Sequence, residues 1–236
     1  TRKESSAASD VYKRQAAGKP TDAEKDAVAL LQLAPGDAVY QYYAQVARGE
    51  TPAQQPVELM RPLFDGMAEF YDMHMVRSLK YQLPKQVADK ILARHPDKKI
   101  NVLDLGCGTG LLGVCLGRLD GALIGVDLSM KMVEQAARHN VYDRFHTVNL
   151  HDALRETPDG LYQVIAALDV FSYAGDLTKA IPNAFRVLTT NGVLIFSCET
   201  APEAGPDLVL LPVGRYAHKL SPVSYTHLTL PTTPYV

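Results

Sequence analysis

The stretch with the clearest chemical character is a glycine-rich loop that follows a short apolar run. Val102–Leu105 reads Val-Leu-Asp-Leu, and Gly106, Gly108 and Gly110 follow at alternate positions before a helical pattern begins at Leu111. Glycines let a backbone turn with positive φ and let a ligand approach without a Cβ atom in the way. Between a strand and a helix, such a loop is typical of nucleotide-binding sites. We therefore predict a nucleotide-like cofactor at this loop.

Two cofactor classes fit the spacing of these glycines. The run Gly108-x-Gly110-x-x-Gly113 matches a dinucleotide fingerprint, which would make the chain an NAD-dependent oxidoreductase. That interpretation leaves Gly106 without a role and brings the Asp104 carboxylate close to a pyrophosphate, which it would repel. S-adenosylmethionine carries a sulfonium and an ammonium group and has no phosphate. Asp104 therefore favours S-adenosylmethionine on electrostatic grounds.

Further acidic residues follow the next apolar runs. Asp127 comes directly after residues 122–126, and a carboxylate at that strand tip can accept hydrogen bonds from both ribose hydroxyls. Ser129 is placed to cap the helix that follows. Asp152 comes after the third run, where it either accepts from an adenine amino group or caps a turn.

The fourth run ends at Asp169, in the crevice where a second substrate enters such sheets. We expect Asp169, Phe171 and Tyr173 on the acceptor side of the site. Arg215 and His218 follow the fifth run and could contact an anionic acceptor.

Short apolar runs alternate with helical patterns around these residues. The runs cover 100–105, 122–126, 145–150, 164–168 and 193–198, and the helical patterns cover 111–118, 130–140 and 177–188. The alternation predicts right-handed βαβ units and an α/β fold with a doubly wound, Rossmann-like, mostly parallel sheet. Pro182 requires the last helix to begin late, near Ile181. Asn191-Gly192 is expected to turn the chain before the last strand.

The pattern before residue 100 is helical. Residues 22–47 predict two helices, and Asp37 is placed to cap the second one. Their junction, Ala-Pro-Gly-Asp, resembles that between tetratricopeptide repeats, with an ordinary helical hairpin as the alternative. Residues 50–62, rich in Pro and Gln, predict a linker, and helices are expected over 63–79 and 84–93.

Composition excludes several classes of protein. The 236 residues hold 24 Lys and Arg against 26 Asp and Glu, which argues against a nucleic-acid-binding protein. No apolar run reaches the roughly 18–20 residues of a membrane helix. Three cysteines without metal-ligand spacing predict no metal site and no disulfide scaffold, and we expect a cytoplasmic protein.

The two ends resemble one DNA element translated in opposite orientations. Codons for Asp-Val-Tyr-Lys-Arg-Gln at 10–15 have a reverse complement that, in a shifted frame, encodes the Pro-Val-Ser-Tyr-Thr-His-Leu at 222–228. Such an element is typical of a sequencing adapter, so we expect 1–15 and 222–236 to be non-native. The expected units are then a helical, tetratricopeptide-like remnant over 16–49, the linker over 50–62, and an α/β domain over 63–221 whose C-terminal strands are missing. We expect catalysis by such a shortened domain to be impaired.

Taken together, residues 102–110, 125–129, 149–153 and 183–194 resemble the motifs of class I S-adenosylmethionine-dependent methyltransferases. A closer resemblance joins Phe64-Asp65-x-x-Ala68-x-x-Tyr71-Asp72-x-His74 with segments 167–177 and 214–218. This set is similar to predicted methyltransferases that carry N-terminal tetratricopeptide repeats. The resemblance implies S-adenosylmethionine as cofactor and a sheet ordered 3-2-1-4-5, and it identifies no acceptor.

Residue roles follow from the motifs and the resemblance together. Tyr71 is expected to cover the cofactor with His74 beside it, unless both only pack within their helix. The expected catalytic residues are Asp169, Tyr173 and His74. The expected cofactor-binding residues are Tyr71, Asp104, Gly106, Cys107, Gly108, Gly110, Asp127, Leu128, Ser129, Met130, Asp152, Ala153 and Asp169.

The expected function is methyl transfer to a small molecule or a protein. Two alternatives stay open. One is an NAD-dependent oxidoreductase. The other is a non-catalytic, cofactor-sensing interaction protein that binds a protein partner through its N-terminal repeats.

Overall fold

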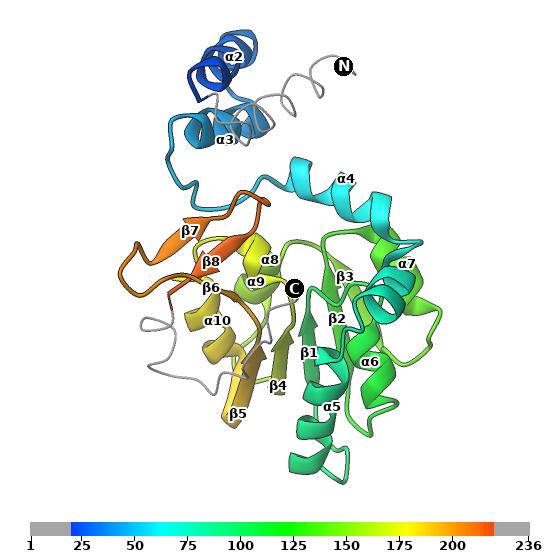
Figure 1. The fold of residues 1–236 in the computed structure, drawn as a ribbon. Coiled ribbons are helices and arrows are strands. Elements are labelled where there is room, and N and C mark those ends of the chain that lie inside the picture. The colour runs from blue at the N-terminus through cyan, green and yellow to red at the C-terminus, as the bar shows by residue number, and fades with distance from the viewer. Residues whose placement is uncertain (1–19, 220–236) are drawn as a thin grey trace.

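Five parallel strands form the central sheet, in the order β3-β2-β1-β4-β5 that the sequence predicted (Figure 1). The computed structural model describes residues 20–219, so the predictions for 1–15 and 222–236 lie outside the described residues. The strands are β1 (Val102–Leu105), β2 (Leu123–Asp127), β3 (Arg144–Thr147), β4 (Tyr162–Ala167) and β5 (Leu188–Phe196).

Helices cover both faces of this sheet because its strands are apolar on both sides. Leu103 and Ile165 pack against α8 (Leu150–Glu156), α9 (Phe171–Ala174) and α10 (Ala180–Val187). Val102 and Val164 point the other way, toward α5 (Leu83–Arg94) and α6 (Leu111–Leu116). α7 (Met130–Ala137) contacts β2 and β3. The predicted doubly wound α/β architecture is therefore confirmed.

Several element boundaries differ from the predicted ones. β3 ends at Thr147, because Asn149 caps α8 through a hydrogen bond from the backbone N–H of Asp152. The Asn191-Gly192 turn lies inside β5 as a bulge: Tyr162 pairs with Leu188, but Val164 pairs with Val193. α10 begins at Ala180, so Pro182 stands in its first turn as the sequence required.

Two short helices, α2 (Pro20–Leu33) and α3 (Ala38–Ala47), form a hairpin with its own small core. Asp37 caps α3, as predicted, by accepting from the N–H groups of Val39 and Tyr40. Leu30 of α2 and Tyr43 of α3 are among the buried residues of this core.

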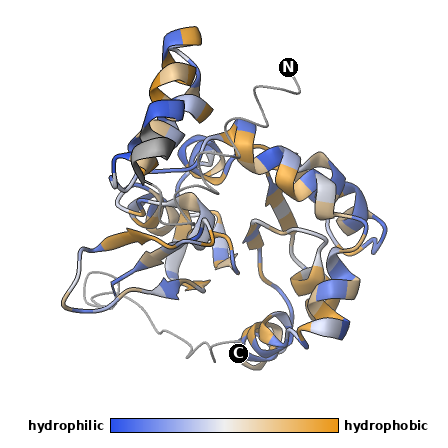
Figure 2. Ribbon diagram, turned by 45° about the horizontal axis from the view of Figure 1, so that its top comes forward, coloured by the Kyte–Doolittle hydropathy of each residue, from blue (hydrophilic) through white to orange (hydrophobic). Residues whose placement is uncertain are grey.

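The single helix predicted over 63–79 is wrong. Two separate helices occupy this region: α4 (Val57–Met67) and the π-helix η1 (Met73–Ser78). α4 begins within the segment predicted as a linker. Pro56 has an extended backbone and forms the N-cap, and its carbonyl accepts hydrogen bonds from the N–H groups of Leu59 and Met60. Pro62, which belongs to the predicted linker, lies inside α4. Figure 2 shows hydrophobic and hydrophilic residues alternating along α4.

A second, three-stranded sheet follows β5. It consists of β6 (Glu199–Thr200), β7 (Leu208–Leu210) and β8 (Tyr216–His218), in the order β6-β8-β7. The strand predicted within 208–213 thus forms, and it pairs with β8 rather than with the edge strand β5. β8 also contacts α9, which brings this sheet beside the ends of β4 and β5 (Figure 1). Within residues 20–219, none of the helices is both long and apolar enough to cross a lipid bilayer.

Candidate active site

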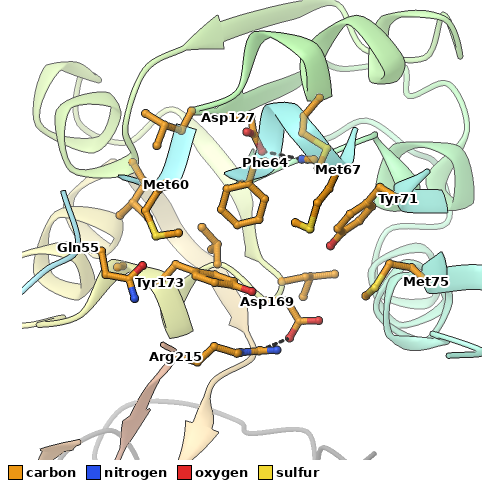
Figure 3. Close-up of a pocket in the computed structure, with 18 of the residues that line it drawn as sticks. Gln55, Met60, Phe64, Met67, Tyr71, Met75, Asp127, Asp169, Tyr173 and Arg215 are labelled. Carbon is orange, nitrogen blue, oxygen red and sulfur yellow. Dashed lines mark hydrogen bonds and ion pairs between the residues drawn. The ribbon is translucent and has the colours of Figure 1, made fainter. Parts of the chain in front are cut away.

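A cavity of about 1370 Å³ opens at the carboxyl ends of β1, β2 and β4 (Figure 3). The glycine loop after β1 and the tip of β2 form one end. α4, η1 and the loops around α9 and β8 form the other. Pockets for single small ligands typically measure about 300–1,000 Å³, so this volume can hold a cofactor and a second molecule together.

The glycine loop has the left-handed backbone that its sequence requires. Gly106, Gly108 and Gly110 have φ values of 67°, 53° and 86°. Gly106 and Gly108 line the cavity, whereas Gly110 caps α6 and packs on Ala136. A Cβ on Gly106 would stand 2.6 Å from the side chain of Val170, so only glycine fits there.

Asp127, at the tip of β2, is held by backbone donors and faces the cavity. One carboxylate oxygen accepts from the N–H of Gly108 and the other from that of Ser129, both at 2.8 Å. Burial raises the pKa of the Asp127 carboxyl, and the two N–H donors oppose that rise. Each oxygen retains a lone pair, so the carboxylate can accept further hydrogen bonds from a ligand.

Asp104 lies deeper, at the back of the glycine loop. Its carboxylate accepts a 2.6 Å hydrogen bond from the Tyr142 hydroxyl. Burial raises the pKa of Asp104 to about 7, although the Tyr142 bond lowers it. Together with Tyr71 and Cys107 it lines a small recess beside the main cavity.

Tyr142 also explains why residue 113, the third glycine of the possible dinucleotide-binding motif, must be glycine. A Cβ on Gly113 would stand 2.3 Å from the Tyr142 ring, and the Gly113 N–H donates to the Tyr142 hydroxyl at 3.2 Å. Gly113 is therefore needed for packing. Cys107 is buried, its thiol pKa is raised by that burial, and its sulfur packs under Gly125.

The predicted residues after β2 and β3 divide into two groups. Leu128 lines the cavity. Ser129 is buried and caps α7 through the Met132 N–H, which is the structural role foreseen for it. The Asp152 carboxylate contacts the Asn149 amide and lies 2.5 Å from Arg155. Asp152 therefore stands in the first turn of α8, and it does not line the cavity; nor do Gly110, Ser129, Met130 and Ala153.

Residues 148–151, between β3 and α8, line this part of the cavity instead. Asn149 and His151 were missed by the sequence interpretation. Their position directly after a strand, equivalent to that of Asp127 after β2, is the signal that could have found them.

α4 and η1 lie across the cavity, and hydrogen bonds join this segment to the loops after β1 and β2. The Ser129 hydroxyl donates to Asp65 at 2.5 Å, and the Thr109 hydroxyl donates to Asp72. Tyr71 and His74 both line the cavity from this segment. Tyr71 has its pKa raised by burial and by the nearby Asp169, whereas His74 is exposed.

The far end of the cavity is organised around Asp169, whose φ of 54° is unusual for a residue other than glycine. Its backbone N–H donates to the Ser197 hydroxyl at 2.7 Å. Arg215 lies 3.6 Å from the Asp169 carboxylate, 3.2 Å from that of Glu199, and over the Tyr173 ring at 5.4 Å. The Tyr173 ring also meets Phe64 edge-on at 5.1 Å. Asp169 and Tyr173 thus come together in the cavity, as expected.

Phe171 and His218 face the protein interior. Phe171 is fully buried against Phe196 in the core. The His218 ring pairs through Nε2 with the Gly175 carbonyl at 2.7 Å, and burial lowers its pKa. The expectation that these two residues face an acceptor is therefore wrong. Among residues 20–219, no group of three or more His, Cys, Asp or Glu side chains is placed to hold a metal ion.

Known methyltransferases resemble the α/β part of this chain. Residues 103–196 match the model of a methyltransferase domain family. The mitochondrial ubiquinone biosynthesis O-methyltransferase of Bos taurus is 26% identical over 145 residues, which cover 57% of this chain and 39% of that protein. The malonyl-[acyl-carrier protein] O-methyltransferase of Halalkalibacterium halodurans is 33% identical over 144 residues, covering 57% and 52%. The chain thus spans about half or less of the length of these relatives.

A solved structure has the same fold. Magnesium protoporphyrin IX methyltransferase from Synechocystis PCC 6803, with bound S-adenosylhomocysteine, superposes with a TM-score of 0.53 at 20% identity, over 71% of this chain and 84% of that one. The strand order, the glycine loop and the family match agree with one another. The α/β part of this chain thus has the fold of that methyltransferase, and residues 103–196 within it match a methyltransferase domain family.

Proposed function

We propose that the chain transfers a methyl group from S-adenosylmethionine to an acceptor that is a small molecule or a protein side chain. One observation carries the proposal: a single cavity joins Gly106, Gly108 and Asp127 at one end to Asp169 and Tyr173 at the other. When bound, the cofactor supplies a methyl group already activated on a sulfonium. The protein must therefore mainly orient the acceptor and exclude water.

The cofactor end has suitable groups. Gly108 has positive φ, and a Cβ there would meet no atom within 4 Å, so a ligand can approach the backbone closely. Asp127 would accept from the ribose hydroxyls, and Leu128 and Asn149 would flank the adenine. Asp104 would attract the cationic methionine end from behind the loop. Tyr71 would cover the cofactor.

The acceptor end limits which groups can remove a proton. Burial raises the pKa of Tyr173, and burial with nearby Asp169 raises that of Tyr71, so both hydroxyls stay protonated at neutral pH and neither serves as a phenolate base. Asp169 and His74 are then the groups that would accept a proton, if the acceptor must lose one.

The NAD-dependent alternative has less support. Gly113 is the last glycine of the dinucleotide-binding motif, and its packing against Tyr142 already accounts for a glycine at this position. Calorimetric titration distinguishes the two, because we expect binding of S-adenosylhomocysteine and none of NAD. The cofactor-sensing alternative would gain if the chain bound cofactor but methylated nothing in a broad extract screen.

The direct test of the site is Asp127→Ala, with Asp120→Ala on an exposed loop as the matched control. Hydrogen bonds to charged groups contribute about 1.5–3 kcal/mol, so we expect S-adenosylhomocysteine affinity to fall about tenfold or more. The control should bind like the unaltered chain. Equal affinity of Asp127→Ala and the unaltered chain would remove Asp127 from the proposed site.

The wider setting of the domain is also part of the proposal. The α2–α3 hairpin with its separate core supports a tetratricopeptide-like segment that binds a protein partner. The three free cysteines support a reducing, cytoplasmic setting. The longer genomic reading frame across both ends tests the adapter interpretation.

A further inference from the structure

Methionines are concentrated on one wall of the cavity. Five of the chain's six methionines line it: Met60, Met67, Met73, Met75 and Met132, called here the methionine wall. Four of them come from the α4–η1 segment, and Figure 3 labels Met60, Met67 and Met75. Methionine side chains are flexible and polarizable, and they adapt to apolar ligands of irregular shape. Such a wall suits an apolar body better than a polar one.

Gln55 places an unpaired polar atom at the Tyr173 end of the cavity. This residue is only 8% exposed, and its amide nitrogen donates to the carbonyl of Gly214. Because that carbonyl can only accept, the amide orientation is fixed, and Oε1 must face away from it. Oε1 is buried and has no hydrogen-bond partner. The amide end points toward Tyr173 in the cavity (Figure 3). A ligand that donates a hydrogen bond to Oε1 would remove the cost of leaving it unpaired.

The charges at this end disfavour an anion. Arg215 is already shared by the carboxylates of Asp169 and Glu199. The three side chains together carry a net negative charge, so a carboxylate or phosphate on the acceptor would be repelled. This balance disfavours the contact with an anionic acceptor that the sequence had indicated for Arg215.

We propose, on the basis of the proposed function, that the acceptor is an uncharged amphipathic molecule. Its apolar body lies against the methionine wall, and a hydroxyl or amino group donates to Oε1 of Gln55. Gln55 is then a residue that determines acceptor specificity.

Three small probes test this at saturating S-adenosylhomocysteine: 4-butylphenol, butylbenzene and 4-butylbenzoate, titrated into the full chain by calorimetry. They share the butylphenyl body and differ in donor and charge. We expect 4-butylphenol to bind about fivefold tighter than butylbenzene, the size of one hydrogen bond. We expect 4-butylbenzoate to bind more weakly than both. Gln55→Met should abolish the advantage of the phenol and leave butylbenzene affinity unchanged. Gln32→Met, exposed on α2, is the matched control and should change neither affinity.

The methionine wall provides a second pair of variants, independent of how well Gln55→Met folds. Met67→Leu should bind butylbenzene as the unaltered chain does, whereas Met67→Gln should bind it at least several-fold more weakly. The cofactor titration is done first. If S-adenosylhomocysteine does not bind, the proposed function itself fails. If it binds, but 4-butylbenzoate binds as tightly as 4-butylphenol or Gln55→Met keeps the advantage of the phenol, the inference about the acceptor is overturned and the proposed function stands.

Discussion

At the tips of β1 and β2 the cavity is lined by glycines and by carboxylates with fixed donors, whereas the opposite end is lined by methionines and unpaired polar atoms. Asp127 accepts from two backbone N–H groups, and Asp104 accepts from Tyr142. At the other end, Oε1 of Gln55 and Nε of Arg215 are buried without partners. The carboxylates at the tips of β1 and β2 thus have fixed donors before any ligand arrives, and the opposite end leaves hydrogen bonds and packing to be completed.

This difference indicates what each end selects. Fixed backbone groups and glycines tolerate one ligand shape, which suits a cofactor common to a whole family. Flexible side chains can repack around different acceptors, which suits a fold whose relatives differ in substrate. Substitutions at the tips of β1 and β2 should therefore have larger effects than conservative ones in the methionine wall.

The largest effect is expected for Gly106→Ala. Alanine at a φ of 67° is strained by about 1–2 kcal/mol, and its Cβ would overlap Val170, at a further cost of about 1–3 kcal/mol. We expect S-adenosylhomocysteine affinity to fall about 100-fold, measured by calorimetry, and the melting temperature to fall as well. Gly36→Ala, where a Cβ meets nothing within 4 Å, is the control. An affinity within threefold of the unaltered chain would mean that this end is as adaptable as the other.

The next effect concerns the charge of Asp104. Burial raises its pKa to about 7, so in the free protein it is mostly neutral at pH 6 and mostly charged at pH 8. If the cationic methionine end binds the charged form, affinity for S-adenosylmethionine should be about tenfold weaker at pH 6 than at pH 8. Asp104→Asn should remove this component. The amino group of the cofactor titrates equally in both proteins, so the difference between the two profiles isolates Asp104. Identical profiles would exclude this electrostatic role.

The same contrast explains what the sequence predicted well. The glycine loop, the position of Asp127 and the caps Asp37 and Ser129 follow from patterns within a few residues of each other, whereas the strand order was implied by the family resemblance. At the tips of β1 and β2, binding geometry is made by the loop itself. A local pattern is therefore enough to find it.

The other end depends on contacts between distant segments. Gln55 meets Gly214 across most of the chain, and Met60 and Gln55 fall in the segment predicted as a linker. For Asp152 the sequence left two roles open, adenine contact or a turn cap, and the structure places it in the first turn of α8 against Arg155 and Asn149. Phe171 and His218 were predicted to face the acceptor and are instead buried by neighbouring elements. Periodicity does not report which of several polar residues near a strand end faces the cavity.

The smallest effect is expected where the two ends join. Thr109 of the glycine loop donates to Asp72, next to η1, and this bond links the fixed end to the segment that bears the methionine wall. One hydrogen bond contributes about 1 kcal/mol net, so Thr109→Val should speed amide hydrogen exchange over residues 68–80 about fivefold.

Thr178→Val is the matched control, because the Thr178 hydroxyl also donates to a carboxylate, that of Asp176, on an exposed loop away from the cavity. It should leave exchange over 68–80 unchanged. If Thr109→Val exchanges there at the rate of the unaltered chain, the Thr109–Asp72 bond does not restrain the methionine-bearing segment, which is then held by its packing and by bonds such as that of Ser129 to Asp65. The adaptable end of the cavity would then move independently of the glycine loop. Faster exchange confined to 68–80, with cofactor affinity retained, would instead show that the glycine loop restrains this segment through the Thr109–Asp72 bond.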